Sequence, residues 1–120
     1  MEKKLTYIAV PYTSDDSAVT EERFRKVSRV AAKLINSGEF LISPISMCHP
    51  ISQEGGLPGD WEFWDEYDKA IIACCYKLYV LMLDGWKEST GVQAEIKIAK
   101  ELGLEIVYID YDDIMEINEN

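Results

Sequence analysis

The sequence is poor in histidine, in basic residues and in long hydrophobic runs. It contains one histidine and three cysteines, Cys48, Cys74 and Cys75, without a C-x-x-C pair, so no metal site is expected. An odd number of cysteines argues against a disulfide framework and favours reduced, buried thiols. The apolar runs are too short to span a bilayer, and the segment LTYIAV after MEKK is typical of a strand rather than of a signal peptide. We therefore expect a cytoplasmic protein without a membrane segment.

The chain also has a deficit of positive charge. Its 12 basic residues face 22 acidic ones, and the formal net charge is −10. A nucleic-acid polymer is excluded as a partner by this balance, because proteins that follow a phosphate backbone carry basic surfaces. A small anion remains possible, since the N-terminus of a helix binds one whatever the global charge. Gly55, Gly56 and Gly59 lack the lysine and the spacing of a P-loop.

What the sequence does contain is an alternation of short apolar runs and helical patterns. Its 120 residues, 48% of them hydrophobic, predict one globular domain over residues 1–120. Strands are predicted at residues 5–10, 39–44, 76–83 and 105–110, and helices over 20–38, from near Asp60, and from Ser89 to Gly103. The side chains predicted to face inward from these helices are Phe24, Val27, Ala31, Leu34 and Ile35, then Trp64, Asp68, Ile71, Ile72 and Cys75, then Val92, Ile96, Ala99 and Leu102.

This order of elements predicts an α/β fold of the Rossmann or flavodoxin-like type, a three-layer sandwich with a mostly parallel sheet of four or five strands. Sheets of this type bind ligands beyond the carboxyl ends of their strands. Here those ends lead into residues 11–20, 43–60 and 84–89. We expect 43–60 to be a long, lid-like loop and 111–120 to be a short cap or a frayed end.

A serine, a glycine and a glutamate open the last predicted helix. Ser89 is a good N-cap, so its hydroxyl and the free amides after it suit a phosphate or a carboxylate. Gly91 lies one turn before Glu95 on the same side of the helix. The missing side chain at Gly91 would let a ligand approach the Glu95 carboxylate. In the simplest alternative, Ser89 only caps the helix and Glu95 is solvated.

Four segments together carry a resemblance to a known family: YIAVPYTSDD, LISPISMCHPI, WDEYDKAIIACCYKLYVLMLDGW and ESTGVQAEIKIA. The chain resembles the nucleoside 2-deoxyribosyltransferase superfamily, most closely its small phage and bacterial members, and it is also similar to the 2′-deoxynucleoside 5′-phosphate N-hydrolases. The resemblance implies that Glu95 is the nucleophile at the sugar C1′. It also implies that Asp68, or else Asp65, assists the base or the sugar, and that Ser89 contacts a phosphate.

The first predicted loop departs from the hydrolase pattern, which has glycine and arginine there. Arg23 or Arg25 is the alternative source of positive charge, whereas Asp15 and Asp16 oppose a phosphate. The further residues predicted to bind substrate lie in or near the loops at the strand ends. They are Tyr7, Pro11, Tyr12, His49, Trp64, Asp84, Gly85, Trp86, Ser89 and Gly91.

From these observations we predict cleavage or transfer at the N-glycosidic bond of a nucleoside or nucleoside 5′-monophosphate. A carboxylate beneath C1′ stabilises the charge that builds there, and a second carboxyl group protonates the departing base. No cofactor or metal is expected, and the family resemblance implies a homodimer or higher homo-oligomer. The alternative is a protein that binds a nucleotide in the same pocket without catalysis, and a flavodoxin-like interaction domain is a further alternative.

Overall fold

The computed structural model describes residues 3–116, and it is an α/β sandwich built on an all-parallel sheet. Over these residues the sheet has four strands in the order β2-β1-β3-β4. The predicted fold class is confirmed. The strands are β1 (Leu5–Ala9), β2 (Phe40–Ile42), β3 (Cys75–Leu81) and β4 (Glu105–Ile109).

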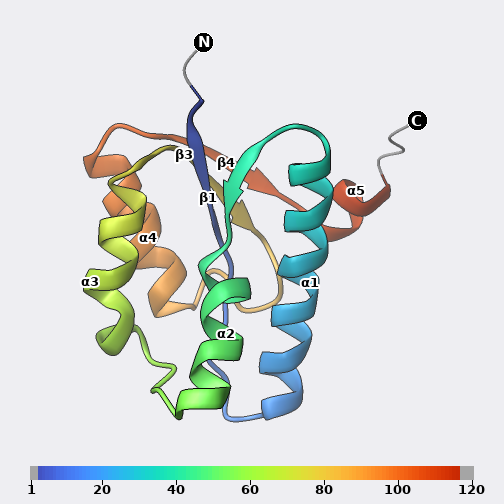
Figure 1. Ribbon diagram of the computed structural model, residues 1–120, viewed down its shortest axis with the longest axis vertical. Helices are drawn as coiled ribbons and strands as arrows, with labels where there is room; N and C mark the ends of the chain where they lie inside the picture. The colour runs from blue at the N-terminus through green and yellow to red at the C-terminus, as the bar shows by residue number, and fades with distance from the viewer. Residues whose placement is uncertain (1–2, 117–120) are drawn as a thin grey trace.

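Helices cover both faces of the sheet. Figure 1 shows α3 and α4 on one side and α1 and α5 on the other, with α2 near the carboxyl ends of the strands. The last four residues of the chain, which belong to the tail predicted as a cap or frayed end, lie outside the described residues. The helices are α1 (Ser17–Asn36), α2 (Pro44–Gly55), α3 (Trp61–Ile72), α4 (Thr90–Glu101) and α5 (Tyr111–Glu116).

The two central strands are mostly apolar, and their later residues are buried on both faces. Successive side chains of a strand point to opposite faces, so Tyr7 packs towards α3 and α4 whereas Ile8 packs towards α1. In β3, Leu78 and Tyr79 divide in the same way. The strands thus supply two separate cores, one beneath each helical layer.

The order of the strands sets the place where a ligand can bind. β1 pairs with β2 on one side and with β3 on the other. The chain therefore passes from β1 to β2 in one direction and then crosses back over β1 to reach β3 in the opposite direction. This reversal opens a crevice beyond the carboxyl ends of neighbouring strands, which is the usual binding place in open α/β sheets.

The segment 43–60 is mostly helical, and the expectation of a long loop there was wrong. Ser43 stands at the N-cap position and Pro44 at the first helical position, where its fixed φ suits a helix. Gly56 ends the helix in the left-handed conformation with φ 68°. Pro50 inside α2 and the glycines after it are typical of loops, and they hid the helix in the sequence.

Four single-residue expectations were also wrong. Ile35, predicted to face inward, is 53% exposed because Leu34 takes the inward position and the next residue lies about 100° around the helix. Leu102 is exposed at the C-cap of α4. Cys75 begins β3 instead of continuing α3. Cys74 is exposed, whereas Cys48 and Cys75 are the buried free thiols.

Among the helices at residues 3–116, none combines the length and the apolar character that crossing a bilayer requires.

Candidate functional site

A cavity of about 580 Å³ lies beyond the carboxyl ends of β1 and β3. Its volume is within the range of small-molecule sites. Its walls come from the end of β1 and the loop that follows, from α2, from the start of α3 and from the start of α4. Most of the residues predicted from the sequence line it, namely Tyr7, Pro11, Tyr12, His49, Trp64, Asp68, Gly85, Ser89, Gly91 and Glu95.

Glu95 lies in this cavity on the inner side of α4. Its side chain is only 7% exposed, and the hydroxyl of Tyr7 donates a hydrogen bond to Glu95 Oε2. Tyr7 reaches it from β1, where the alternation of the strand directs the phenol towards α3 and α4. The glutamate is therefore buried and oriented, and the reading of Glu95 as a solvated surface carboxylate does not fit the structure.

Asp68 of α3 is the second buried carboxyl group of the cavity. Burial raises its pKa to about 7, the negative charge of Asp65 raises it as well, and a hydrogen bond from the Tyr7 hydroxyl lowers it. Asp65, the alternative in the sequence, does not line the cavity; its Oδ1 lies 3.3 Å from Lys69 Nζ. Of the two aspartates, the structure places Asp68 at the site.

Tyr7 connects the two carboxyl groups. Burial raises the pKa of Glu95 well above its usual range, the charge of Asp68 adds to that rise, and the bond from Tyr7 opposes it. Burial also raises the pKa of Tyr7, and both carboxylates reinforce the effect. Two carboxyl groups this close do not both ionise easily, and they titrate as a pair. Near neutral pH the trio can therefore hold one carboxylate, one carboxylic acid and a phenol that donates.

The start of α4 forms another part of the wall. Ser89 Oγ accepts a hydrogen bond of 3.2 Å from the amide of Val92, as predicted for an N-cap. Thr90 and Gly91 line the cavity beside it. A Cβ at Gly91 would lie 3.5 Å from Trp61 Cε3. This is ordinary contact distance, so the indole ring of Trp61 borders the space above Gly91, and Trp61, Gly91 and Glu95 all line the cavity.

Arg23 holds together two of the loops at the cavity. From α1 its guanidinium donates to the carbonyl oxygens of Tyr12, Thr13 and Asp84, at 3.3, 3.0 and 2.9 Å. Gly85 makes this possible, because its φ is +92° and a Cβ there would lie 2.8 Å from Arg23 Nη2. Of the two arginines considered from the sequence, Arg23 is the one that lines the cavity.

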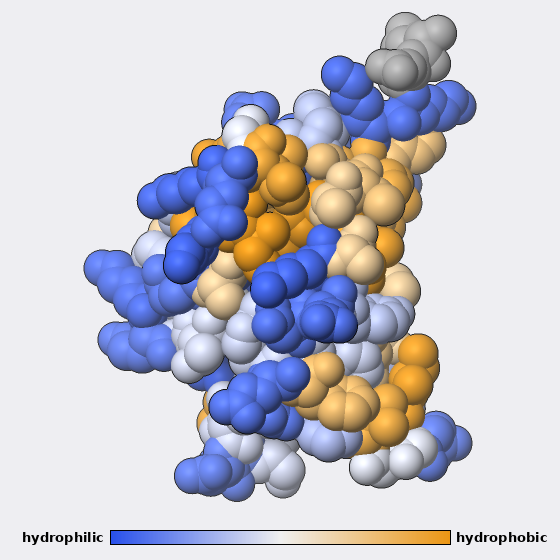
Figure 2. All heavy atoms as spheres, turned by 90° about the vertical axis from the view of Figure 1, so that its left-hand side faces the viewer, coloured by the Kyte–Doolittle hydropathy of each residue, from blue (hydrophilic) through white to orange (hydrophobic). Residues whose placement is uncertain are grey.

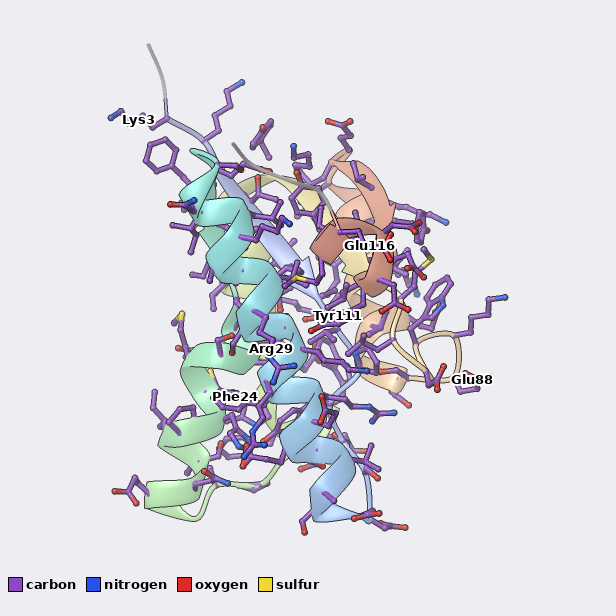
Figure 3. The ribbon with its side chains drawn as sticks, turned by 90° about the vertical axis from the view of Figure 1, so that its right-hand side faces the viewer. Lys3, Phe24, Arg29, Glu88, Tyr111 and Glu116 are labelled. Atoms are coloured by element: carbon purple, nitrogen blue, oxygen red, sulfur yellow. The ribbon has the colours of Figure 1, made fainter. Side chains whose placement is uncertain are left out.

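A second polar cluster lies where α1 meets α2. His49 is buried, and its Nδ1 is hydrogen-bonded to the hydroxyl of Tyr12. Its Nε2 lies 3.4 Å from Glu21 Oε2. Phe24 of α1 stacks on the imidazole with ring centroids 4.2 Å apart, and Figure 3 shows Phe24 in the space between α1 and α2. Glu21 was not predicted, since one acidic residue in a polar stretch carries no signal in a sequence.

Two predicted residues do not line the cavity. Trp86 packs against the core beneath α3 and α4 and lies 5.7 Å from the ring of Tyr108. Asp84 contributes its backbone carbonyl to Arg23 rather than its carboxylate to the site. Gly85 between these two residues takes a positive φ, and Trp86 after it is partly buried against the core rather than directed into the cavity.

Trp64 also lines the cavity. Its indole Nε1 donates a hydrogen bond of 2.7 Å to the carbonyl of Pro58. Its ring meets Phe63 and Tyr67 edge to face, with centroids 5.1 and 5.3 Å apart. The ring is therefore held in place next to Trp61, and the two indoles give the cavity an aromatic wall on which a planar base can stack.

Comparison with known families gives one match. The model of a domain of unknown function, DUF1937, matches residues 4–110. The chain belongs to this family. The matched residues include every side chain named above as lining the cavity. A comparison with curated proteins finds no match.

The DUF1937 family is described without an activity, and the chemistry open to the cavity depends on its side chains. Within residues 3–116, no group of three or more histidine, cysteine, aspartate or glutamate side chains is placed to hold a metal ion. What the cavity offers is a pair of buried carboxyl groups joined by a phenol, an aromatic wall, and donors at the start of α4.

Proposed function

We propose that this DUF1937 protein binds a nucleoside or nucleoside 5′-monophosphate in the cavity and cleaves or transfers its N-glycosidic bond. The observation that carries the proposal is the trio of Tyr7, Asp68 and Glu95, buried together in a cavity of about 580 Å³ at the strand ends. The resemblance of the sequence to the nucleoside 2-deoxyribosyltransferase superfamily supports the same conclusion independently of the geometry.

The energetics of the trio favour a functional role for it. Burying a carboxyl group costs free energy, and a second one beside it adds repulsion. Apolar residues at the positions of Asp68 and Glu95 would avoid both costs. Strongly perturbed carboxyl groups in a cavity are typical of catalytic sites.

In the proposed reaction, the Glu95 carboxylate attacks C1′ of the sugar while the C1′–N bond breaks. The new C1′–O bond takes its electron pair from Glu95, and the electron pair of the old bond passes to the base. Tyr7 orients the carboxylate through its hydrogen bond. Asp68, with a pKa of about 7, is suited to give and take a proton at neutral pH. Water or a second base then releases the sugar from Glu95.

The start of α4 is the proposed place for a 5′-phosphate. Ser89, with the amides of Thr90 and Gly91, presents donors and the positive end of the helix dipole. Arg23 adds a positive charge in the same cavity, whereas Asp60, Glu62 and Glu88 in the lining oppose an anion. The donors would act on a phosphate at contact distance, whereas its repulsion by exposed carboxylates is screened over about 8–10 Å at ordinary salt.

Assembly into a homodimer or higher homo-oligomer is part of the proposal. Beside the cavity, α2 and α3 expose Met47, Ile51, Phe63 and Tyr67, each between 42% and 53% accessible. Figure 2, which views the molecule from the α3 and α4 side, shows hydrophobic surface on this face. Exposed apolar area of this kind is suited to a protein interface. A cytoplasmic location is also proposed, and the free thiols support it.

One observation favours the alternative of binding without catalysis. The pKa of Glu95 is raised by burial and by the charge of Asp68, and a protonated glutamate is not a nucleophile. A nucleotide-binding protein with the same cavity would then hold its ligand through Glu95 as a hydrogen-bond donor.

Incubation with a panel of nucleosides and nucleoside 5′-monophosphates, followed by chromatography for free base, tests the proposal. Release of base by the wild type but not by Glu95→Gln is the expected result. Tight binding of a nucleotide without any release of base would establish the binding alternative. Neither binding nor release across the panel would overturn both.

A further inference from the structure

The cluster of Tyr12, His49 and Glu21 is a second set of titratable groups that the proposed reaction does not yet use. Tyr12 and His49 line the cavity, but they come from the loop after β1 and from α2. The carboxyl pair comes from α3 and α4, which lie to the left of α2 in Figure 1. The cavity therefore has polar groups on two walls.

The contacts of His49 determine what Tyr12 can offer a ligand. If the imidazole is neutral with its proton on Nε2, facing Glu21, then Nδ1 accepts from the Tyr12 hydroxyl and the ligand meets only the lone pairs of Tyr12. If the imidazole is charged, Nδ1–H donates to Tyr12, and the hydroxyl proton of Tyr12 is free to point into the cavity. Glu21 Oε2 lies 3.4 Å from Nε2, on the side of the imidazole opposite to Tyr12.

The surroundings hold this arrangement in place. Stacking on Phe24 orients the imidazole. Tyr12 packs near Gly59, where an added Cβ would lie 3.6 Å from its Cε2, and Thr13 Oγ1 donates a hydrogen bond of 2.7 Å to the Gly59 carbonyl. The charged and titratable groups near the cluster are Glu21 of α1, Cys48 beside His49 on α2, Arg23 of α1 at the carbonyl of Tyr12, and Asp68 of α3, which lines the same cavity.

We propose that Tyr12 is the residue that protonates the departing base, and that His49 and Glu21 position Tyr12 and restore its proton. This inference rests on the function proposed above. Asp68 shares the hydroxyl of Tyr7 with Glu95, so it lies beside the nucleophile. A base that leaves C1′ on the side opposite to Glu95 departs towards a different wall, and Tyr12 stands on such a wall.

Atoms and electrons balance in this step. The electron pair of the C1′–N bond passes to the base, and the base takes the hydroxyl proton of Tyr12. Tyr12 takes the Nδ1 proton of His49, which becomes neutral while Nε2–H continues to face Glu21. After water has released the sugar from Glu95, the proton that the water gives up returns His49 to its charged form.

The first test uses the fact that the chain has one histidine. In a sample labelled with ¹⁵N-histidine and free of any affinity tag, every imidazole signal belongs to His49. Tyr12→Phe is expected to shift the Nδ1 resonance. The control is Tyr111→Phe, which is expected to leave that resonance unchanged. The Tyr111 hydroxyl accepts a hydrogen bond of 3.3 Å from Arg29, and neither residue lines the cavity. An unchanged Nδ1 resonance in Tyr12→Phe would overturn the proposed contact.

The second test varies how much the departing base needs a proton. A nucleoside that the wild type cleaves is compared with an analogue whose base leaves without one, the N7-methylated form of a purine nucleoside or the 5-fluoro form of a pyrimidine nucleoside. Tyr12→Phe should lower kcat/KM for the parent by roughly a hundredfold or more and for the analogue by only a few-fold. His49→Gln should follow the same pattern, and Glu21→Gln should show it more weakly.

Equal losses for parent and analogue would mean that Tyr12 only supports the loop, and would overturn the inference while leaving the proposed function intact. Release of base with no loss in Tyr12→Phe would do the same. Failure of the wild type to release base from any substrate would overturn the proposed function and this inference together, so the two failures are distinguishable.

Discussion

The two faces of the sheet are built from the same strands but hold different interiors. Beneath α1 and α5 the buried side chains from β1, β3 and the residues just after them are Ile8, Val10, Leu81 and Leu83. The hydroxyl of Tyr79 donates to Glu39 at 2.7 Å. Beneath α3 and α4 the core contains Tyr7, and the carboxyl groups of Asp68 and Glu95 are buried beside it. In β1 the neighbouring residues Tyr7 and Ile8 point to opposite faces of the sheet, so each belongs to a different one of these two cores.

We expect this contrast to separate stability from the proposed function. The face beneath α1 gains stability from apolar burial with few polar groups to satisfy. The face beneath α3 and α4 gives up part of that gain, because its carboxyl groups are buried and their pKa values are raised. Substitutions on the two faces should therefore act on different measurements.

The largest effect is expected for Glu95→Gln. If Glu95 is the nucleophile, the release of base should fall roughly a thousandfold or more, while the fold and ligand binding persist. The matched control is Glu101→Gln, the same substitution at an exposed position of α4, which should keep the wild-type rate. Near wild-type turnover by Glu95→Gln would sink the mechanism.

Leu81→Ala on the opposite face should reverse the pattern. Leu81 is fully buried beneath α1, so its truncation should cost about 3 kcal/mol of unfolding free energy and about 10 °C in Tm. At a temperature where the variant is folded, its kcat/KM should equal that of the wild type. Leu102→Ala, at a side chain that is 51% exposed, is the control and should have little effect on Tm. Loss of activity in folded Leu81→Ala would mean that the two faces are coupled.

Asp68→Asn should stabilise the protein at alkaline pH. The pKa of Asp68 is about 7 in the folded protein against the ordinary value of 3.8, so between these values the folded state binds the additional proton. The stability that this group contributes is therefore lost as pH rises towards 7. From pH 5 to pH 8, the unfolding free energy of Asp68→Asn should rise by about 2 kcal/mol relative to that of the wild type. Urea unfolding at each pH measures this difference.

Glu66→Gln, at an exposed position of the same helix, is the control for that series and should give no such trend. The activity of Asp68→Asn is measured on the same samples, and it should fall even though stability rises. A difference in unfolding free energy that stays constant from pH 5 to pH 8 would contradict the raised pKa of Asp68.

The smallest effect is expected for Ser89→Ala. This substitution should change both the stability of the protein and its affinity for a phosphate-bearing ligand. The loss of the cap on the Val92 amide should cost about 1 kcal/mol. If Ser89 also binds a phosphate, a 5′-monophosphate should bind the wild type about tenfold more tightly than its nucleoside, and Ser89→Ala should remove most of that difference.

Asp16→Ala is the matched control for Ser89, because Asp16 caps α1 in the same way by accepting from the Ala18 amide at 2.9 Å. It should lose similar stability and keep the preference for the monophosphate. Equal binding of nucleoside and monophosphate by the wild type would leave Ser89 as a cap only.

The sequence alone determined the fold class and the position of Glu95 at the site. Continuous apolar strands and helical periodicity are local properties, and they predicted the parallel sheet and three of its helices. Ser89 and Glu95 were found because both belong to the first turns of one helix, where the helical repeat alone predicts which residues share a face. The helix at 44–55 was missed because proline and glycine, which end most helices, here lie at its first turn, inside it and at its end.

Only the tertiary structure decided which distant residues meet. The bond from Tyr7 to Glu95 joins residues 88 positions apart, and Tyr12 meets His49 across 37 positions. Trp86 and Asp84 looked like ligand contacts in the sequence, but Trp86 packs partly buried against the core, and Asp84 contributes its backbone carbonyl to Arg23. A sequence carries the pattern within each element, whereas contacts between elements depend on packing, and the pKa values of the buried carboxyl groups follow from those contacts.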